Sequence, residues 1–179
     1  MPFEFAHVCE LLQELDRQKY QQRATYAKWD DPSHRVVAVW YSKYTDQISR
    51  NGVSAIALLS TLLPERRNDR TYDLQEERLS KIFARELGLG ATRLKSLNGW
   101  RNRDGPDFAT CVERVMAESE FEPPRPGEQV SVEEIDLALT RVAANMVSSA
   151  PAIRANADGE AATNILKPII RRLQSNEAK

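Results

Sequence analysis

Apolar residues recur at intervals of three and four along almost the whole chain, and no two segments alternate as paired β-strands would. This spacing places apolar side chains on one face of an α-helix, so it predicts amphipathic helices that pack together. Only seven glycines and 7% aromatic residues also argue against a sandwich or barrel. With 179 residues, 41% of them hydrophobic, the chain can bury one core. We therefore predict an all-α fold, a single compact multi-helix bundle domain over residues 1–179.

Two helices are expected near the N-terminus. The first follows Pro2, and the second follows Pro32 with Ser33 as its N-cap. The polar segment between them, from Asp16 to Pro32, is expected to be irregular. The residues expected to face inward are Phe5, Val8, Leu12 and Leu15 in the first helix and Val36, Val37, Trp40, Tyr44 and Ile48 in the second.

The middle of the chain predicts further helices. The segment Val53 to Leu63 is apolar almost all round, which is typical of a helix enclosed by others. The next helix should end at Gly88 in a left-handed cap, and another should begin at Pro106. The apolar stripes of these two helices are Leu74, Leu79, Ile82, Phe83 and Leu87, then Phe108, Cys111, Val112 and Val115.

A helix start is clearly marked at Ser131. Ser131 and Glu134 have the spacing of a capping box, and Val130 and Ile135 have that of a hydrophobic staple. The last helix contains Pro168, which removes a backbone donor, so we expect a kink or break near Asn164.

Charge is balanced overall but unevenly distributed. The formal net charge is -1, which by itself does not indicate a nucleic-acid binder, because phosphate affinity depends on a locally basic face. Acidic residues gather between Glu118 and Asp136, and the last segment is basic again. A basic cluster occupies the middle of the chain, with Arg66, Arg67, Arg70, Arg78, Lys81, Arg85, Arg93, Lys95, Arg101 and Arg103. These residues could also be solvated helix faces, with Glu76, Glu77 and Glu86 pairing along the helix.

Several classes of protein are disfavoured. No apolar run is long enough to cross a bilayer, and the start of the chain lacks a signal peptide, so we expect a soluble intracellular protein without a membrane partner. Cys9 and Cys111 lie among apolar neighbours and are expected to be buried thiols. Two histidines, His7 and His34, are too few for a zinc site, so we expect no metal.

The stretch Leu62 to Lys81 is the most informative motif. An apolar run ends at Pro64, a charged cluster follows, and Tyr72 and Leu74 lead into a charged helical segment. This arrangement resembles the signature of the N-terminal DNA-binding domain of eukaryotic ATP-dependent DNA ligases, most closely the DNA ligase IV branch, with a fungal-type sequence as one option. The segments Phe5 to Cys9, Asp104 to Ala109 and Leu173 to Lys179 are similar to other parts of that family in the same order.

The resemblance implies a fragment that holds DNA while another domain seals it. Ligases attack ATP with the lysine of a Lys-x-Asp-Gly motif. The comparable stretch here begins with Asn102 and offers no amine, so we expect this fragment to be non-catalytic. We expect it to end before the nucleotidyltransferase and OB domains, with ATP and Mg required only by the full-length ligase. The resemblance also implies a role in DNA repair and recombination by non-homologous end joining, and a location in the nucleus.

The expected mechanism is contact with sugar and phosphate across the minor groove of double-stranded DNA at nicks or ends. Such contact is indifferent to sequence. By position in the family, the loops Asp16 to Lys28 and Ser148 to Asn164 are candidates, with Ser148, Ser149 and Gly159 allowing close approach of the backbone. The expected contact residues are Arg17, Lys19, Arg23, Arg154, Asn156 and Lys167, and the central basic cluster is a second candidate face.

Two further functions remain open. In the DNA ligase IV branch, the first two helices receive a peptide of the nuclease Artemis, which implies partner-binding roles for Phe5, Val8, Trp40 and Tyr44, although aromatic pairs between helices are commonly core. A fungal-type sequence could lack that partner. The alternative is a helical protein-interaction module without intrinsic DNA binding, which would show no salt-dependent affinity for duplex DNA.

Overall fold

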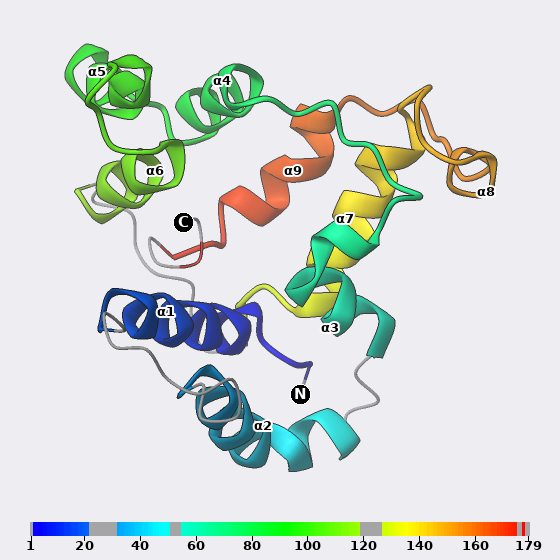
Figure 1. Ribbon diagram of the computed structural model, residues 1–179. Helices are drawn as coiled ribbons and strands as arrows, with labels where there is room; N and C mark the ends of the chain where they lie inside the picture. The colour runs from blue at the N-terminus through cyan, green and yellow to red at the C-terminus, as the bar shows by residue number, and fades with distance from the viewer. Residues whose placement is uncertain (1, 22–31, 51–54, 119–126, 175–176, 178–179) are drawn as a thin grey trace.

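The computed structural model describes residues 2–21, 32–50, 55–118, 127–174 and 177, and within these ranges every regular element is a helix (Figure 1). The prediction of an all-α fold is confirmed. No helix in these ranges is long and apolar enough to cross a membrane. The helices are α1 (Phe5–Gln21), α2 (Pro32–Arg50), α3 (Ala55–Leu62), α4 (Glu76–Glu86), α5 (Ala91–Leu97), α6 (Phe108–Ala117), α7 (Val132–Ala144), α8 (Pro151–Arg154) and α9 (Ala162–Ile170), with 3-10 turns η1 (Pro64–Arg66) and η2 (Asn98–Arg101).

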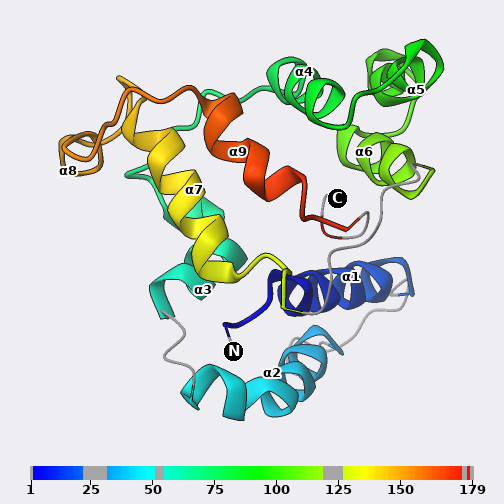
Figure 2. The same cartoon turned by 180° about the vertical axis from the view of Figure 1, so that it is seen from behind.

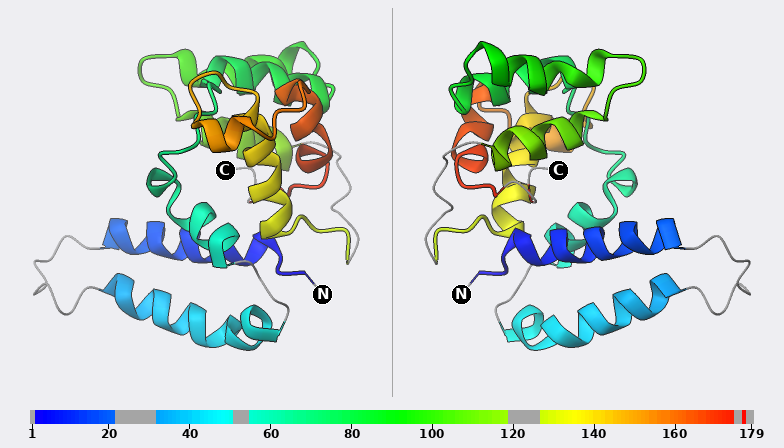
Figure 3. Two further views of the ribbon diagram at one scale, coloured as in Figure 1. Left: turned by 90° about the vertical axis from the view of Figure 1, so that its right-hand side faces the viewer. Right: turned by 90° about the vertical axis from the view of Figure 1, so that its left-hand side faces the viewer.

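Helices α1 and α2 lie side by side as a long pair below the other helices (Figure 3). The indole N–H of Trp40 donates to the carbonyl oxygen of His7 at 2.7 Å and ties the two helices together. The prediction of an irregular segment from residue 16 is wrong at its start, because α1 continues to Gln21. Ser33 lies inside α2, which begins at Pro32, so it is not the residue before the helix.

The apolar stripe of α1 differs by one residue from the prediction. Leu11 is buried at 3% exposure, whereas Leu12 is 43% exposed. Both leucines satisfy the spacing of three to four from Val8, and only the position of α2 decides between them. Val37 of α2, also expected inside, is 43% exposed.

Two hydrophobic cores hold the helices together. The larger core joins α4, α5, α6, α7 and α9, and the smaller joins α1, α2, α3 and the start of α7. Phe5 packs against both cores. The members of the larger core with less than 2% exposure are Leu97, Val112, Val115, Val130 and Val142, and those of the smaller core are Phe3, Val8 and Val132.

Helix α7 runs from one core to the other, and its start is fixed as the sequence predicts. The Ser131 hydroxyl accepts from the Glu134 amide at 3.2 Å, and the Glu134 carboxylate accepts from the Ser131 amide at 2.8 Å. This confirms the capping box. The start of α1 and the residue Phe3 before it pair with the same turn. The Phe5 amide donates to the Val130 carbonyl at 2.8 Å, and the Val132 amide donates to the Phe3 carbonyl at 3.0 Å.

Helix α3 is not enclosed by its neighbours, contrary to expectation. It packs mainly on α7 and buries Ala57 and Leu58. Its outer face carries Ile56 and Leu59, which are 68% and 56% exposed. Composition marks α3 as apolar all round, but only one side is covered by the described residues.

The end of α4, the start of α6 and the course of α9 can be compared with the predictions. Gly88 follows α4 with a φ of 59°, which confirms the left-handed cap. Helix α6 begins at Phe108 rather than at Pro106, because the Asp107 carboxylate caps it by accepting from the Thr110 amide at 2.8 Å. Helix α9 continues from Ala162 through Pro168 to Ile170, so the expected break near Asn164 is absent. Pro168 has no N–H to donate to the carbonyl of Asn164, and Asn164 is an exposed residue.

Candidate functional site

Residues 148–161, which comprise α8 and the turns on both sides of it, form a projection that we call the α8 platform. It lies at one edge of the molecule, beyond the end of α7 (Figures 1 and 2). Arg154 and Asn156 are both exposed on it. The structure thus brings together two of the residues that the sequence predicts to contact DNA.

The entry to the α8 platform is bonded to the segment that follows η1. The Ala150 amide donates to the Asp69 carbonyl at 3.0 Å. The Ser149 hydroxyl accepts from the Thr71 amide at 2.9 Å and donates to the Thr71 carbonyl at 3.1 Å. Ser149 is 5% exposed, so its short side chain serves packing inside the protein rather than close approach of a ligand.

The exit of the α8 platform is bonded to the last turn of α7. The Arg141 guanidinium donates twice to the Asp158 carboxylate, at 2.8 and 3.0 Å, and also to Glu160. The Asn145 amide donates to Asp158 at 2.9 Å and to the Glu160 carbonyl at 3.1 Å, and its oxygen accepts from the Gly159 amide at 2.9 Å. The hydrogen bond from Asn145, followed by those from the Glu160 amide and Arg141, holds the pKa of Asp158 well below its usual range.

These contacts determine the charge that the α8 platform presents. Its two carboxylates, Asp158 and Glu160, share the guanidinium of Arg141. Arg154 is exposed, and no ion pair within the described ranges involves it. A guanidinium with five free donors fits a phosphate oxygen, so the α8 platform can hold an anionic backbone at this point.

The other predicted contact residues are not part of this surface. Lys167 is half-buried on α9, and Arg17 is exposed near the far end of α1, where it pairs with Glu14 at 3.3 Å. The end of α1 and the α8 platform lie on opposite sides of the molecule (Figure 1). The side chain of Lys19 and the whole of Arg23 lie outside the described residues, so their roles stay predictions.

The central basic cluster is not one continuous face. Arg70 is 9% exposed and binds Asp136 of α7 at 2.6 Å, and Arg67 binds Asp69 at 2.8 Å and the Ser60 hydroxyl at 2.6 Å. Lys81 and Arg101 both pair with Glu77. The charged part of the Leu62 to Lys81 motif therefore connects α3, α7 and the α8 platform inside the protein.

Sequence reasoning did not identify Arg141 and Asn145. Arg141 lies in α7 and Asn145 is its C-cap, 13 to 19 residues before the groups that they bind. No short-range spacing links them to Asp158 and Glu160, and only the return of the chain after α8 brings the two sets together.

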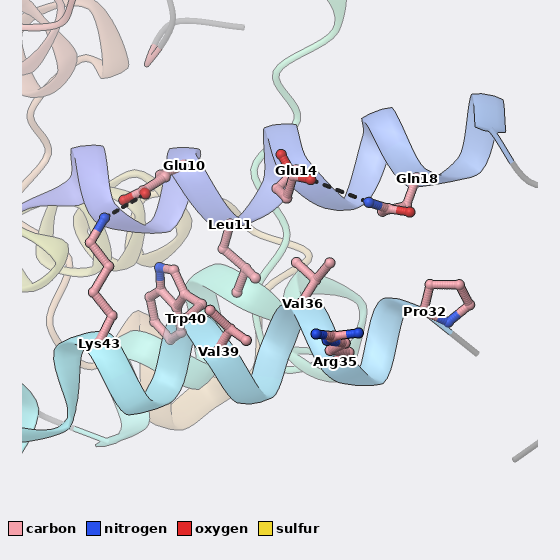
Figure 4. A pocket seen from close by; sticks show the side chains of 10 residues that line it. All are labelled: Glu10, Leu11, Glu14, Gln18, Pro32, Arg35, Val36, Val39, Trp40 and Lys43. Atoms are coloured by element: carbon pink, nitrogen blue, oxygen red, sulfur yellow. Dashed lines mark hydrogen bonds and ion pairs between the residues drawn. The ribbon is translucent and has the colours of Figure 1, made fainter. Parts of the chain in front are cut away.

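A groove of about 540 Å³ runs between α1 and α2 (Figure 4). Its floor is apolar, with Leu11, Val36 and Trp40, and Val39 lines it at 62% exposure. Glu10, Glu14 and Gln18 of α1 and Arg35 and Lys43 of α2 supply its polar lining. Lys43 donates to Glu10 at 2.6 Å across one end, and this bond and a second one from Tyr44 lower the pKa of Glu10.

The predicted partner-binding residues are mostly core. Val8, Trp40 and Tyr44 are 0%, 6% and 5% exposed, and of these only Trp40 lines the groove. The Tyr44 ring stacks on His7 at 4.2 Å, and burial is the main cause that lowers the pKa of His7. Phe5 is half-buried between the two cores. Trp40 is therefore the one aromatic of this set that a partner in the groove would touch.

Histidine, cysteine and carboxylate side chains decide whether a metal or thiol site can exist. In the described part of the chain, no group of three or more His, Cys, Asp and Glu side chains could hold a metal ion. Cys9 and Cys111 are free and buried, as predicted, and burial raises the pKa of Cys9 to about 12. A thiol of this kind is protonated at neutral pH and unreactive.

Comparison with known proteins connects this architecture to a family. No curated protein matches the chain. The family model described as DNA ligase N terminus matches residues 4–179. Because this match covers all but the first three residues, the chain belongs to the DNA ligase N-terminal domain family.

Proposed function

We propose that this chain holds double-stranded DNA at nicks or ends, independently of sequence, for a DNA ligase whose other domains carry out the sealing reaction. Membership of the DNA ligase N-terminal family supports a DNA partner. The observation that carries the proposal is Arg154 on the α8 platform, which is exposed and forms no ion pair with any residue that the structure describes. Arg141 compensates one of the two neighbouring carboxylate charges, of Asp158 and Glu160, which reduces their repulsion of an approaching phosphate.

The α8 platform suits contact with the backbone rather than with base edges. Besides Arg154, its exposed residues from 151 to 157 are alanine, proline and Asn156. Asn156 can bond sugar or phosphate oxygens, and alanines allow close approach to a groove. The minor groove carries a degenerate code, so contact there and with phosphates serves an enzyme that must join any end.

Fluorescence anisotropy with labelled nicked, intact and single-stranded DNA over a salt series tests this proposal. We expect Arg154→Ala to weaken duplex binding at every salt concentration and to reduce the slope of log K against log salt by about 0.9, the value for one phosphate contact. Arg114→Ala is a matched control, because Arg114 is an exposed arginine on α6 with no ion pair within the described ranges.

The outcomes separate the two classes of function. Salt-dependent duplex binding that falls with Arg154→Ala and not with Arg114→Ala supports the proposal. Equal losses in both variants would indicate a general charge effect and remove Arg154 from the interface. Absence of duplex binding at low salt would favour the alternative, a helical interaction module without intrinsic DNA binding.

The finer assignment is a DNA ligase IV-like protein that acts in non-homologous end joining in the nucleus, with ATP and Mg used by the full-length enzyme. The Leu62 to Lys81 motif and its resemblance to that branch support this assignment. In this proposal residues 1–179 are one helical DNA-binding domain that precedes the nucleotidyltransferase and OB domains. End-joining assays in cells that lack the native ligase, with the full-length protein supplied, would test it.

A second function is favoured by the groove between α1 and α2. We propose that it receives a short peptide of an Artemis-like nuclease, with apolar side chains against Trp40 and Val39. Val39→Asp places a charge on the groove surface, and Val147→Asp is its control, because Val147 is 82% exposed after α7 and does not line the groove. Binding of a labelled peptide should be lost only with Val39→Asp; equal affinity for both variants would contradict the proposal.

A further inference from the structure

Two adjacent arginines directly after α9 reach in opposite directions. The Arg172 guanidinium donates to Glu134 of α7 at 2.6 Å, whereas that of Arg171 lies 3.2 Å from Glu86 of α4. Helix α9 therefore lies between α7 and α4, as Figure 2 also shows. Lys167 precedes Arg171 by four residues, so both side chains lie on the same side of α9, toward α4.

The carboxylate of Glu86 is enclosed at the end of α4. Its side chain is 3% exposed, whereas those of its two cationic neighbours, Arg85 and Arg171, are 70% and 53% exposed. The Arg85 guanidinium lies 3.7 Å from Glu86. A buried carboxylate is costly unless cations compensate it, so Glu86 restrains both guanidinium groups at the surface.

This cluster holds more positive than negative charge. Arg85 and Arg171 lie against one carboxylate, Lys167 lies one turn before Arg171, and no other ion pair within the described ranges involves these three cations. One oxygen of Glu86 has no hydrogen bond of good geometry, although Arg171 lies 3.2 Å away. The contact is thus mainly electrostatic, and N–H donors of Arg171 remain available to a second anion.

We propose that Arg85 and Arg171, which Glu86 restrains, form with Lys167 a second phosphate site for the backbone of duplex DNA at the junction of α4 and α9. The inference rests on the proposed function and extends it. The end of α9 is separated from the α8 platform by much of the width of the molecule (Figure 1). A duplex that contacts both surfaces is therefore held at two separate points.

The test uses variants that preserve the buried ion pair. Arg85→Ala with Lys167→Ala leaves the contact between Arg171 and Glu86 intact, and Arg114→Ala is the exposed control. Two lost phosphate contacts should reduce the salt slope for duplex DNA by about 1.8. A second variant, Arg171→Ala with Glu86→Gln, removes the ion pair without leaving a buried charge and should reduce the slope by about 0.9. Thermal unfolding checks that each variant is folded.

Two results distinguish an error about the second phosphate site from an error about DNA binding as a whole. If Arg154→Ala weakens binding but the α4 and α9 variants behave as Arg114→Ala does, the second site is wrong and the first stands. If the unchanged protein does not bind duplex DNA, both are wrong. A second experiment follows the NMR signal of the Arg171 Nε–H during titration with inorganic phosphate and with duplex DNA. A signal that moves with phosphate but not with duplex DNA would indicate a site for small anions and overturn the assignment to DNA.

Discussion

Asp69 is held in its ionised form by the neighbouring guanidinium. Arg67 donates to both carboxylate oxygens, at 2.9 and 2.8 Å, and these bonds are the largest cause that lowers the Asp69 pKa from 3.8 to about 2. The carboxylate is 39% exposed, so solvent screens part of the interaction. The pair nonetheless restrains the segment after η1, whose Asp69 carbonyl accepts a hydrogen bond from the Ala150 amide of the α8 platform.

The lowered pKa predicts a pH dependence of stability. Because the folded pKa lies below the unfolded one, the contribution of Asp69 is complete above about pH 4 and is lost as the pH falls toward 2. Thermal unfolding followed by circular dichroism from pH 5 to pH 2 should show a steeper loss of Tm for the native protein than for Asp69→Asn. Parallel pH profiles would contradict this explanation.

Gly105 lies where a side chain has no room. A Cβ atom there would be 2.3 Å from the carbonyl oxygen of Gly99, which is backbone and cannot move alone. Gly105→Ala should therefore destabilise the protein by roughly 1–3 kcal/mol in urea unfolding, as overpacking does. Gly90→Ala is the control, because a Cβ at Gly90 meets nothing within 4 Å; equal effects would mean that the turn adjusts without cost.

At the scale of elements, α7 supports the α8 platform through its last turn. Arg141→Ala should leave Asp158 and Glu160 uncompensated on the α8 platform and weaken duplex binding about five- to tenfold. Arg141→Lys keeps the charge but not the forked geometry, so its affinity for duplex DNA should lie between those of the unchanged protein and of Arg141→Ala. Hydrogen exchange at the Gly159 amide should accelerate in Arg141→Ala. Unchanged affinity and exchange would show that Asn145 alone holds the turn.

Local signals predicted some elements well and could not predict others. The capping box at Ser131 and the cap at Gly88 depend on residues within one turn, so the sequence contains the whole interaction. The choice between Leu11 and Leu12, and the exposure of Ile56 on α3, depend on which neighbouring helix covers which side. The candidate site follows the same rule. Arg154 could be proposed from its position in a loop. Arg141 and Asn145 could not, because they bind residues that reach them only when the chain folds back after α8, and the spacing of apolar residues contains no signal for that.

At the scale of the whole molecule, Phe5 connects the two hydrophobic cores. Phe5→Ala removes this half-buried ring and should lower the free energy of unfolding by roughly 2 kcal/mol, less than truncation of a fully buried phenylalanine would. Phe5→Ala should also weaken the coupling between the cores, so that tryptophan fluorescence and far-UV circular dichroism give different urea midpoints. Leu12→Ala, a truncation at 43% exposure on the same helix, should change stability by less than about 1 kcal/mol. Coincident midpoints in Phe5→Ala would show that α7 alone couples the cores.

The bonds at both ends of the α8 platform also bear on the speed of association. A loop that is fixed in the free protein loses its conformational freedom during folding, so little ordering remains when a ligand arrives. Encounter is then limited mainly by diffusion and orientation, and rate constants for such rigid surfaces are typically about 10⁵–10⁷ M⁻¹s⁻¹ or higher with electrostatic attraction. For the proposed role at rare nicks or ends within long stretches of intact duplex, a first contact on this surface would require no rearrangement.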